Sequence, residues 1–391
     1  MTVDAPVRPA GALARITRDD AAFLRDTWGR SAAVFPAVPG GDFERLLSFD
    51  DVDRIVSTMS LRTPMFRLVQ AGPTFTEAEY TRAGRTGSRP VTGIADPIRI
   101  FAMFRGGATI VLQGLHRYWE PVSRLVRELE VELGHPCQVN AYITPPGAQG
   151  LALHTDPHEV FVLQTFGAKR WEIHAAPEEE RRAPVDATLS PGDAVYMPTG
   201  TPHAASTQET LSGHLTIGVH VTSWREVVAG IWKRLEADPS LDDHVPAGWL
   251  RDRAAFGEAV RERIATLRAS LDLVDPGDVA ATRTEAFLSS RAPLLRGALS
   301  DELRVAGLDD RTVVSRRPGS VCDLTTRGGE LTVLLGDRRL VMPAWLEPAM
   351  RWIAVQDRFA VGDLSAHLAD ASSRAVLVRR LAREGLLLLD R

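Results

Sequence analysis

Cysteine, lysine and asparagine are scarce in this sequence of 391 residues, which has two cysteines, two lysines and one asparagine. Cys137 and Cys322 are far apart and in no metal-binding spacing, which excludes a disulfide framework and a cysteine-ligated zinc site. No run of 18 apolar residues and no export signal occurs, so we expect no membrane partner. These absences together favour a cytoplasmic protein.

A large excess of charge of one sign is also lacking, because 46 basic residues oppose 50 acidic ones and the net charge is -4. Such a balance creates no global field that would attract nucleic acid or an anionic membrane. Apolar residues make up 44% and charged residues 25% of the chain, as in folded globular proteins. The length is sufficient for two or three domains.

The few residues of the scarce types gather in one stretch. Asn140 is the only asparagine, Lys169 is one of two lysines, and Tyr142 and Tyr196 are two of the four tyrosines. The preference for arginine over lysine reflects base composition more often than function. Exceptions to this preference are therefore informative, and these lie within the segment that carries the metal-ligand pattern described below.

The first half of the chain is predicted to be mainly β-structure behind a helical beginning. Apolar spacing of three and four predicts short helices over residues 19–60, and β-type runs separated by turn residues predict strands over 64–115. A stripe of apolar residues predicts a helix from Tyr118 to Leu133. Six short strands follow over 138–221, separated by tight turns at PPGAQG, FGA, SPG and PTGTP, which favours a sandwich or barrel such as the double-stranded β-helix of cupins.

The second half changes character after Ser223 and carries no strand signals until residue 313. Amphipathic, charged segments predict a helical module over residues 223–297. The tail, 298–391, contains a predicted hairpin, then helices and a final strand, an α+β arrangement that suggests a winged-helix-like domain. The catalytic domain would then comprise residues 1–222.

The segment His154-Thr155-Asp156 places two metal-ligand types two residues apart. If the segment is a strand, both side chains point to the same face. His203 lies 47 residues after Asp156, behind a predicted strand and the turn TGTP, and two hairpins fit between them. Two imidazoles and one carboxylate leave three coordination positions open, which is the ligand set of non-haem iron(II) oxygenases.

Two other histidines compete for the third ligand position. His158 lies beside the motif with the same parity, although the turn-forming Pro157 makes it the weaker choice. His174 ends a predicted strand. Four further histidines are expected at the surface or at helix ends, because they lie in predicted loops or helices without partners: His116, His135, His244 and His367.

Lys169 opens the strand that is predicted to face the motif. A 2-oxoglutarate cosubstrate carries a distal carboxylate, which needs a cation inside a barrel. Lysines at such positions are often solvated hairpin residues, but in a chain that otherwise uses arginine we favour the functional interpretation. Arg170 alternates to the other face and is the second candidate.

Two stretches, QVNAYITPPGAQGLALHTDPHEVFVLQTFGAKRWEIHA and GDAVYMPTGTPHAAS, strongly resemble the JmjC ribosomal oxygenases, also described as cupin-4 proteins. The resemblance is continuous from about Ile110 to Val219 and looser over the whole chain. It implies an α+β protein with a JmjC jelly roll, a helical dimerisation module and a C-terminal winged-helix-like domain. Thr155 departs from the bulkier aromatic residue of many relatives.

The resemblance also implies an activity, an iron(II)- and 2-oxoglutarate-dependent hydroxylation of a protein side chain. Iron would be bound by His154, Asp156 and His203, and the distal carboxylate of 2-oxoglutarate by Lys169. Asn140 and Tyr142 match positions that help to place the substrate, although both side chains can equally be plain strand residues. The substrate would be an arginine or histidine of a ribosomal protein, and the protein a homodimer.

Two other functions remain open from the sequence. The same oxygenase can act on a biosynthetic peptide or a small metabolite, and a cupin can bind metal without catalysis, as a scaffold. A nucleic-acid partner is not expected, because the arginines of the last predicted helix lie beside acidic residues and read as a solvated face: Arg374, Arg379, Arg380 and Arg383.

Overall fold

The computed structural model describes residues 11–37, 43–70, 73–148, 152–174 and 184–390. Contacts divide the chain into two units, Met1–Val221 with Arg317–Gly319, and Thr222–Arg316 with Ser320–Arg391. Within the described ranges, no helix combines the length and the apolar character that crossing a membrane requires.

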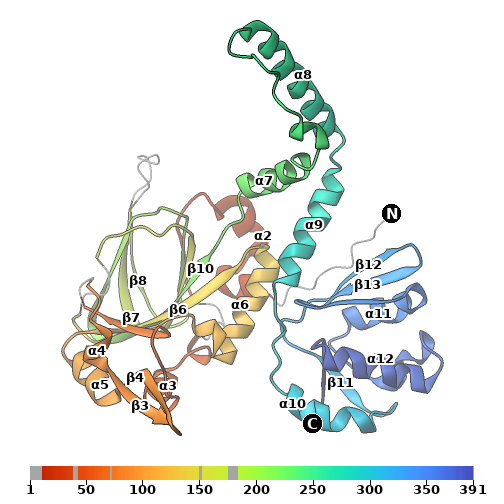
Figure 1. Ribbon diagram of the computed structural model, residues 1–391. Coiled ribbons are helices and arrows are strands. Elements are labelled where there is room, and N and C mark those ends of the chain that lie inside the picture. Colours follow the sequence, from red (N-terminus) through yellow and green to blue (C-terminus); the bar gives the residue numbers. More distant parts are fainter. Residues whose placement is uncertain (1–10, 38–42, 71–72, 149–151, 175–183, 391) are drawn as a thin grey trace. The chain divides into compact units, whose positions relative to one another are not determined.

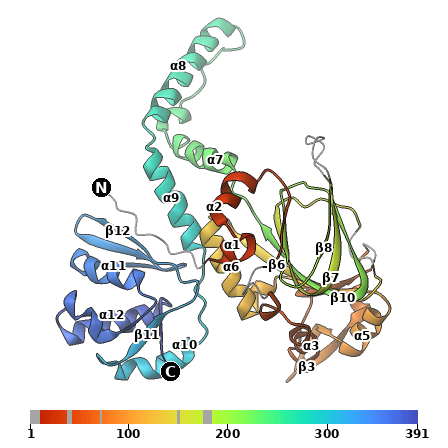
Figure 2. The ribbon, with the colours of Figure 1, turned by 180° about the vertical axis from the view of Figure 1, so that it is seen from behind.

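One antiparallel sheet of eight strands dominates the first unit, and Figures 1 and 2 show it curved round on itself as an open barrel. Its strands are β1 (Ala33–Phe35), β2 (Phe66–Val69), β5 (Thr109–Leu112), β6 (Cys137–Thr144), β7 (Glu159–Ile173), β8 (Val185–Leu189), β9 (Ala194–Met197) and β10 (His203–Val219). Neighbours follow the order β1, β9, β7, β10, β6, β5, β2, and β8 pairs with β7 beside this path.

Strand β7 runs without interruption through FGA, where the sequence predicts a turn, so that prediction is wrong. The chain passes this point by a change of register against β10 rather than by a turn. Gly167 has φ +63°, and a Cβ there would lie 1.6 Å from the carbonyl oxygen of Leu211. Glycine therefore permits the close crossing of the two long strands.

Helices and a hairpin surround the sheet in the first unit. The helices are α1 (Ala12–Thr17), α2 (Asp20–Ala22), a π-helical turn (Phe23–Thr27), 3-10 turns (Phe43–Arg45 and Leu115–Arg117), α3 (Phe49–Thr58), α4 (Glu77–Tyr80), α5 (Pro97–Arg105) and α6 (Glu120–Leu133), and the hairpin is β3 (Thr81–Thr86) with β4 (Arg89–Ala95). The predicted helix from Tyr118 to Leu133 is confirmed as α6, which ends at Gly134 with φ +67°. Figure 2 shows α1 and α6 beside β6.

The two faces of β6 belong to different environments. Alternate residues on one face join the larger hydrophobic core together with the apolar stripe of α6: Val139, Ala141 and Ile143. The residues between them have the opposite parity: Asn140, Tyr142 and Thr144. Strand alternation therefore directs this second set away from that core, and Tyr142 toward the cavity described below.

The second unit begins with the helices that the sequence predicts. They are α7 (Trp224–Leu235), a 3-10 turn (Pro239–Asp242), α8 (Arg253–Asp272) and α9 (Pro276–Ser289). Ser223 caps α7 through a capping box with Glu226. None of the 20 residues of α8 is buried, so this helix leaves its apolar side chains exposed.

The remainder of the second unit is a mixed α+β domain with its own core. Its elements are α10 (Ala298–Arg304), a 3-10 turn (Val305–Gly307), β11 (Val313–Arg316), β12 (Asp323–Arg327), β13 (Glu330–Leu334), β14 (Arg339–Pro343), a 3-10 turn (Ala344–Leu346), α11 (Glu347–Val355), β15 (Arg358–Ala360), a 3-10 turn (Val361–Ala366), α12 (Ala371–Arg383) and β16 (Leu387–Leu389). The predicted hairpin and final strand are both present, as β12 with β13 and as β16 beside β11.

Candidate metal and cosubstrate site

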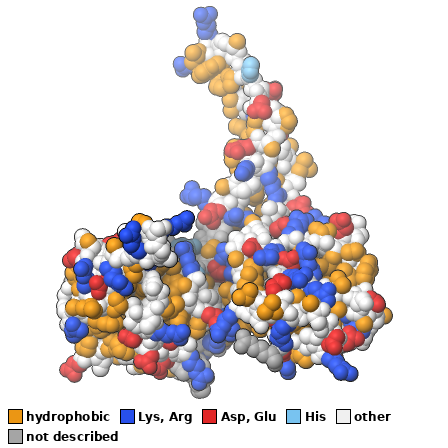
Figure 3. Space-filling model, turned by 60° about the horizontal axis from the view of Figure 1, so that its bottom comes forward, with side chains coloured by type: hydrophobic (Ala, Val, Ile, Leu, Met, Phe, Trp, Pro, Cys, Tyr) orange, Lys and Arg blue, Asp and Glu red, His pale blue; other side chains and the backbone are white. Residues whose placement is uncertain are grey.

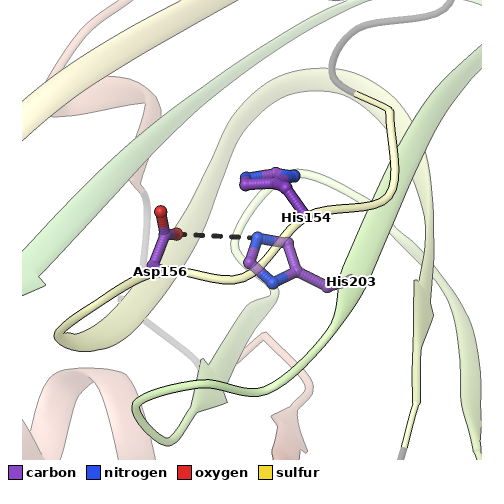
Figure 4. Close-up of side chains that lie close together, drawn as sticks. All are labelled: His154, Asp156 and His203. Atoms are coloured by element: carbon purple, nitrogen blue, oxygen red, sulfur yellow. Dashed lines mark ion pairs between the residues drawn. The ribbon is translucent and has the colours of Figure 1, made fainter.

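The three predicted ligands lie together in the first unit, as Figure 4 shows. One ligand atom from each of His154, Asp156 and His203 lies within 4.8 Å of the others. The Nε2 atom of His203 is 3.6 Å from Oδ2 of Asp156, and the centroids of the two imidazole rings are 4.3 Å apart. The sequence prediction that these side chains converge is confirmed.

The route by which they converge differs from the predicted one, because the segment around His154 is not a strand. A single bridge joins the segment to the start of β10, with amide-to-carbonyl hydrogen bonds of 3.1 and 2.9 Å between His154 and His203. The amide of Gly200 also donates to the carbonyl of Asp156 at 2.9 Å. Backbone bonds to the TGTP turn thus replace the regular strand pairing that the sequence predicted.

Both imidazoles are oriented by their Nδ1 atoms. Nδ1 of His154 is 2.8 Å from the carbonyl of Ala152, and Nδ1 of His203 is 2.9 Å from the carbonyl of Thr201. Because a carbonyl only accepts hydrogen bonds, the proton must be on Nδ1, which leaves Nε2 free as a ligand. Burial also lowers the pKa of His203, which favours the neutral ring that a metal requires.

The two competing histidines take other places. The ring of His158 packs edge-on against that of His220, with centroids 5.2 Å apart. His174 is exposed, and its amide donates to the carbonyl of Pro202. Within the described ranges, the cluster of metal-ligand side chains contains neither of them.

A cavity of about 400 Å³ adjoins the triad and holds Lys169. The Lys169 side chain is 2% exposed, and its Nζ donates one hydrogen bond, to the hydroxyl of Thr144 at 3.3 Å. Burial lowers the pKa of Lys169 to about 7. A buried ammonium is stable only beside an anion, so the cavity is suited to a guest that carries a carboxylate.

Arg170, the second candidate for that role, is on the outside of the barrel. Its guanidinium bonds Asp186 at 2.5 and 2.8 Å and lies 3.3 Å from Glu172. These ion pairs raise the pKa of Arg170. Strand alternation therefore makes Lys169 the cation of the cavity, and the prediction of Arg170 as an alternative is wrong.

The two predicted substrate-binding residues have different surroundings. Tyr142 lines the cavity, and burial raises the pKa of its hydroxyl. Asn140 is not among the lining residues, and its amide oxygen accepts a hydrogen bond from the backbone of Gly114 at 3.0 Å. The amide oxygen of Asn140 thus supports the backbone before Leu115, and a role of Asn140 in placing the substrate stays a prediction.

Sequence reasoning did not single out three further residues that line the cavity. They are His214 on β10, Trp171 on β7 and Arg67 on β2. His214 has the same alternation as Thr216, which also lines the cavity, so a face assignment for β10 could have found it. The register shift between Gly213 and His214 hides this face from a simple count along the chain.

Comparison with known proteins agrees with this geometry. The JmjC domain matches residues 116–227, which include all three ligands and Lys169. The chain is 32% identical over 248 residues to the bifunctional lysine-specific demethylase and histidyl-hydroxylase NO66 of Branchiostoma floridae, and 32% identical over 252 residues to ribosomal oxygenase 2 of Bos taurus. The chain thus contains a JmjC domain and is similar to ribosomal oxygenases.

The matched segments cover only part of this chain and only part of each relative. They cover 63% and 60% of this chain, and 37% and 50% of the NO66 protein and of ribosomal oxygenase 2, respectively. The chain therefore spans half or less of the length of these curated relatives, so what the whole relatives do is carried over below only as a proposal.

The same fold occurs in solved structures. The Escherichia coli ribosomal oxygenase YcfD superposes with a TM-score of 0.54 over 96% of this chain and 99% of that chain, at 18% identity. A structure of YcfD in complex with cobalt and 2-oxoglutarate superposes with a TM-score of 0.52 at 17% identity. The JmjC/cupin fold predicted from the sequence is thus confirmed.

Proposed function

We propose that this protein is an iron(II)- and 2-oxoglutarate-dependent hydroxylase of a protein side chain, with a ribosomal protein as its substrate. The observation that carries the proposal is the pairing, in one cavity, of a two-histidine, one-carboxylate cluster with a buried lysine. The ligand cluster alone and the buried lysine alone each have simpler explanations. Together they match a metal and a dicarboxylate bound side by side.

The donor set fits iron(II). Two neutral imidazole nitrogens and one carboxylate oxygen on one side of an ion leave three positions for other ligands. His154, Asp156 and His203 would hold the metal, with their orientation set by the carbonyls of Ala152 and Thr201. When bound, the metal and 2-oxoglutarate supply the oxidising chemistry.

The chain's own residues then bind, orient and shield. Lys169 would pair with the distal carboxylate of 2-oxoglutarate because, among the described residues, its buried ammonium bonds only the neutral hydroxyl of Thr144. Apolar side chains of β7 line the same cavity and exclude water from it: Val160, Val162 and Trp171. Tyr142, which lines the cavity, would contact the substrate side chain, and Asn140, on the same strand, would help to position it.

The substrate class rests on the relatives. Proteins named ribosomal oxygenase 2, ribosomal oxygenase 1 and histidyl-hydroxylase are 26 to 32% identical to this chain over 51 to 63% of its length. We infer an arginine or histidine side chain of a ribosomal protein as the target. The exposed Leu153 beside the triad offers an apolar contact to such a polypeptide at the cavity mouth.

Succinate release from 2-oxoglutarate by the iron-loaded protein tests the function, with and without ribosomal proteins, followed by mass spectrometry of those proteins. Turnover that depends on them, with one peptide heavier by one oxygen, is the expected result. Turnover that does not depend on ribosomal proteins would indicate that the substrate is a biosynthetic peptide or a small metabolite. An absence of turnover together with tight zinc binding would favour a non-catalytic scaffold.

The helical module, residues 223–297, is proposed to form a homodimer. Trp224, Val228 and Trp232 follow one another at intervals of four on α7 and are 82%, 58% and 47% exposed. Figure 3 shows hydrophobic side chains along this module. A stripe of this kind is normally covered, and a second copy of the module is the partner that we propose.

The tail, residues 298–391, is proposed to be winged-helix-like without a nucleic-acid partner. The arginines of α12 all have partners within the domain: Arg374 with Asp310 at 2.6 Å, Arg379 with the carbonyl of Val305 at 2.9 Å, Arg380 with Glu384 at 2.8 Å and Arg383 with Glu302 at 3.3 Å. Arg374 is buried, which corrects the prediction that it lies on a solvated face. Side chains so engaged are poorly available for phosphates.

A further inference from the structure

His214 is a buried imidazole that none of the roles above uses. It is 3% exposed and lies on β10, opposite Tyr142 on β6. Its ring stacks on that of Tyr142, with centroids 5.2 Å apart and planes at 5°, and meets the ring of Trp171 edge-on at 5.3 Å. Two aromatic rings thus fix both the position and the plane of the imidazole, at the wall of the cavity.

In the described part of the chain, three side chains that line the cavity each have a polar atom without a hydrogen-bond partner. Nδ1 of His214 is buried without a hydrogen-bond partner, and the same holds for Nε1 of Trp171 and Nε of Arg67. Buried polar atoms are almost always bonded, so three unmet ones in side chains that line a single cavity mark this wall as unusual. His214, Trp171 and Arg67 line the same cavity as Lys169, and the two cations Arg67 and Lys169 make this wall suited to an anionic guest.

His214 and Lys169 can make different interactions with an anionic guest. Burial holds the pKa of His214 well below its ordinary value, and the nearby charge of Lys169 lowers it further. A neutral imidazole has one N–H to donate. Because no acceptor in the described ranges holds a proton on Nδ1, the proton can be on Nε2, the ring nitrogen that is left to bond a molecule in the cavity. Lys169 supplies charge, and His214 can supply a directed hydrogen bond.

We propose that His214 is a cosubstrate-binding residue, which donates a hydrogen bond from Nε2 to the distal carboxylate of 2-oxoglutarate that Lys169 pairs with. This inference rests on the proposed function, because it concerns the same cosubstrate. One carboxylate oxygen would face the ammonium and the other the imidazole. The neutral donor fixes the direction of the carboxylate, which a lysine, as a flexible point charge, fixes poorly.

The test compares two ligands on three proteins in the absence of oxygen. The ligands are 2-oxoglutarate and 2-oxopentanoate, which has a methyl group in place of the distal carboxylate. Their dissociation constants are measured calorimetrically on the manganese-loaded wild type and on the variants His214→Phe and His214→Gln. Phenylalanine keeps the stack on Tyr142 but has no donor, whereas glutamine places an N–H near the position of Nε2.

His214→Phe should weaken 2-oxoglutarate binding roughly ten- to hundredfold. It should leave 2-oxopentanoate and manganese binding unchanged, and His214→Gln should recover part of the loss. Equal weakening of both ligands, or none, would overturn the proposal by assigning His214 a merely structural role. A wild type that binds manganese but neither ligand would instead contradict the proposed function itself.

Nuclear magnetic resonance of the wild-type imidazole makes the test independent of variant folding. With ¹⁵N-labelled histidine, 2-oxoglutarate should shift the Nε2–H proton of His214 downfield, as a bond to a carboxylate does, and 2-oxopentanoate should not. The same shift with both ligands, or with neither, would overturn the assignment.

Discussion

The amide of His154 donates to the carbonyl of His203 at 3.1 Å, and the amide of His203 donates back to the carbonyl of His154 at 2.9 Å. The backbone thus joins two metal ligands that lie 49 positions apart in the sequence. Because no side chain takes part in these two bonds, the site's framework is separate from its donors.

Replacing His154 by alanine should therefore remove the metal without unfolding the site. We expect iron affinity to fall by more than the 10- to 100-fold that loss of an outer partner of a metal ligand costs. The melting temperature of the metal-free protein should stay close to that of the wild type. Thr155→Ala, at an exposed position between the ligands, is the control and should bind iron normally.

Lys169 should make the stability of the ligand-free protein depend on pH. Its pKa is about 7 in the folded state and near its ordinary value when unfolded, so the unfolded chain binds more protons between these values. The free energy of unfolding should thus rise with pH above 7, by on the order of a few kcal/mol, and fall again as the pH returns to 7.

The variant Lys169→Met isolates this contribution. It should lack this pH dependence, be more stable than the wild type at pH 7, and bind 2-oxoglutarate poorly. Urea unfolding of both proteins between pH 7 and 10 measures the difference. Parallel pH profiles for the two proteins would show that the lysine is charged and compensated in the free protein.

The crossing of β7 and β10 predicts that substitution by alanine destabilises the protein much more at one glycine than at another. Gly167 and Gly87 both have φ near +60°, but an added Cβ meets the carbonyl of Leu211 at 1.6 Å at the first and open space at the second. Gly87→Ala should cost about 1 kcal/mol through its backbone conformation alone. Gly167→Ala should cost about 3 kcal/mol or more, because backbone must move.

Chemical denaturation of the two glycine variants gives both values. Because the register shift between Gly213 and His214 follows directly on this crossing of β7 and β10, Gly167→Ala should lose 2-oxoglutarate affinity as well. Equal destabilisation by the two substitutions would contradict the close crossing of the strands.

The proposed dimer predicts a change of mass on substitution of the exposed stripe. Trp224→Ser together with Val228→Ser should convert a dimer into a monomer by light scattering at micromolar concentration. Ile98→Ser is the matched control, because Ile98 is 83% exposed but lies outside the helical module. A wild type that is already monomeric would refute the dimer.

The sequence was sufficient to predict many of the helices and strands and the cluster of ligand residues, but not the strand pairing around them. Apolar periodicity predicted α6, and the spacing of His154, Asp156 and His203 predicted the cluster, because these depend on local pattern and ligand chemistry. The bridge at His154 and the continuous β7 depend on long-range pairing, which a local pattern does not encode.

Individual residues within the site were harder still to predict. Asn140 attracted attention by its rarity, although its partner is the backbone of Gly114. His214 went unnoticed because its importance comes from Lys169, Tyr142 and Trp171, which the fold brings to it from other strands. Composition identifies unusual residues, whereas the residues that share a cavity become apparent only once the strands are packed together.

The most direct test of the central claim is an anaerobic titration of the iron(II)-loaded protein with 2-oxoglutarate, followed by the visible charge-transfer absorption of a 2-oxoacid chelated to iron(II). The band should appear and saturate in the wild type, be absent in Asp156→Ala, and require far more 2-oxoglutarate in Lys169→Met. A wild type that binds iron but develops no band, or an unchanged titration of Lys169→Met, would contradict that claim.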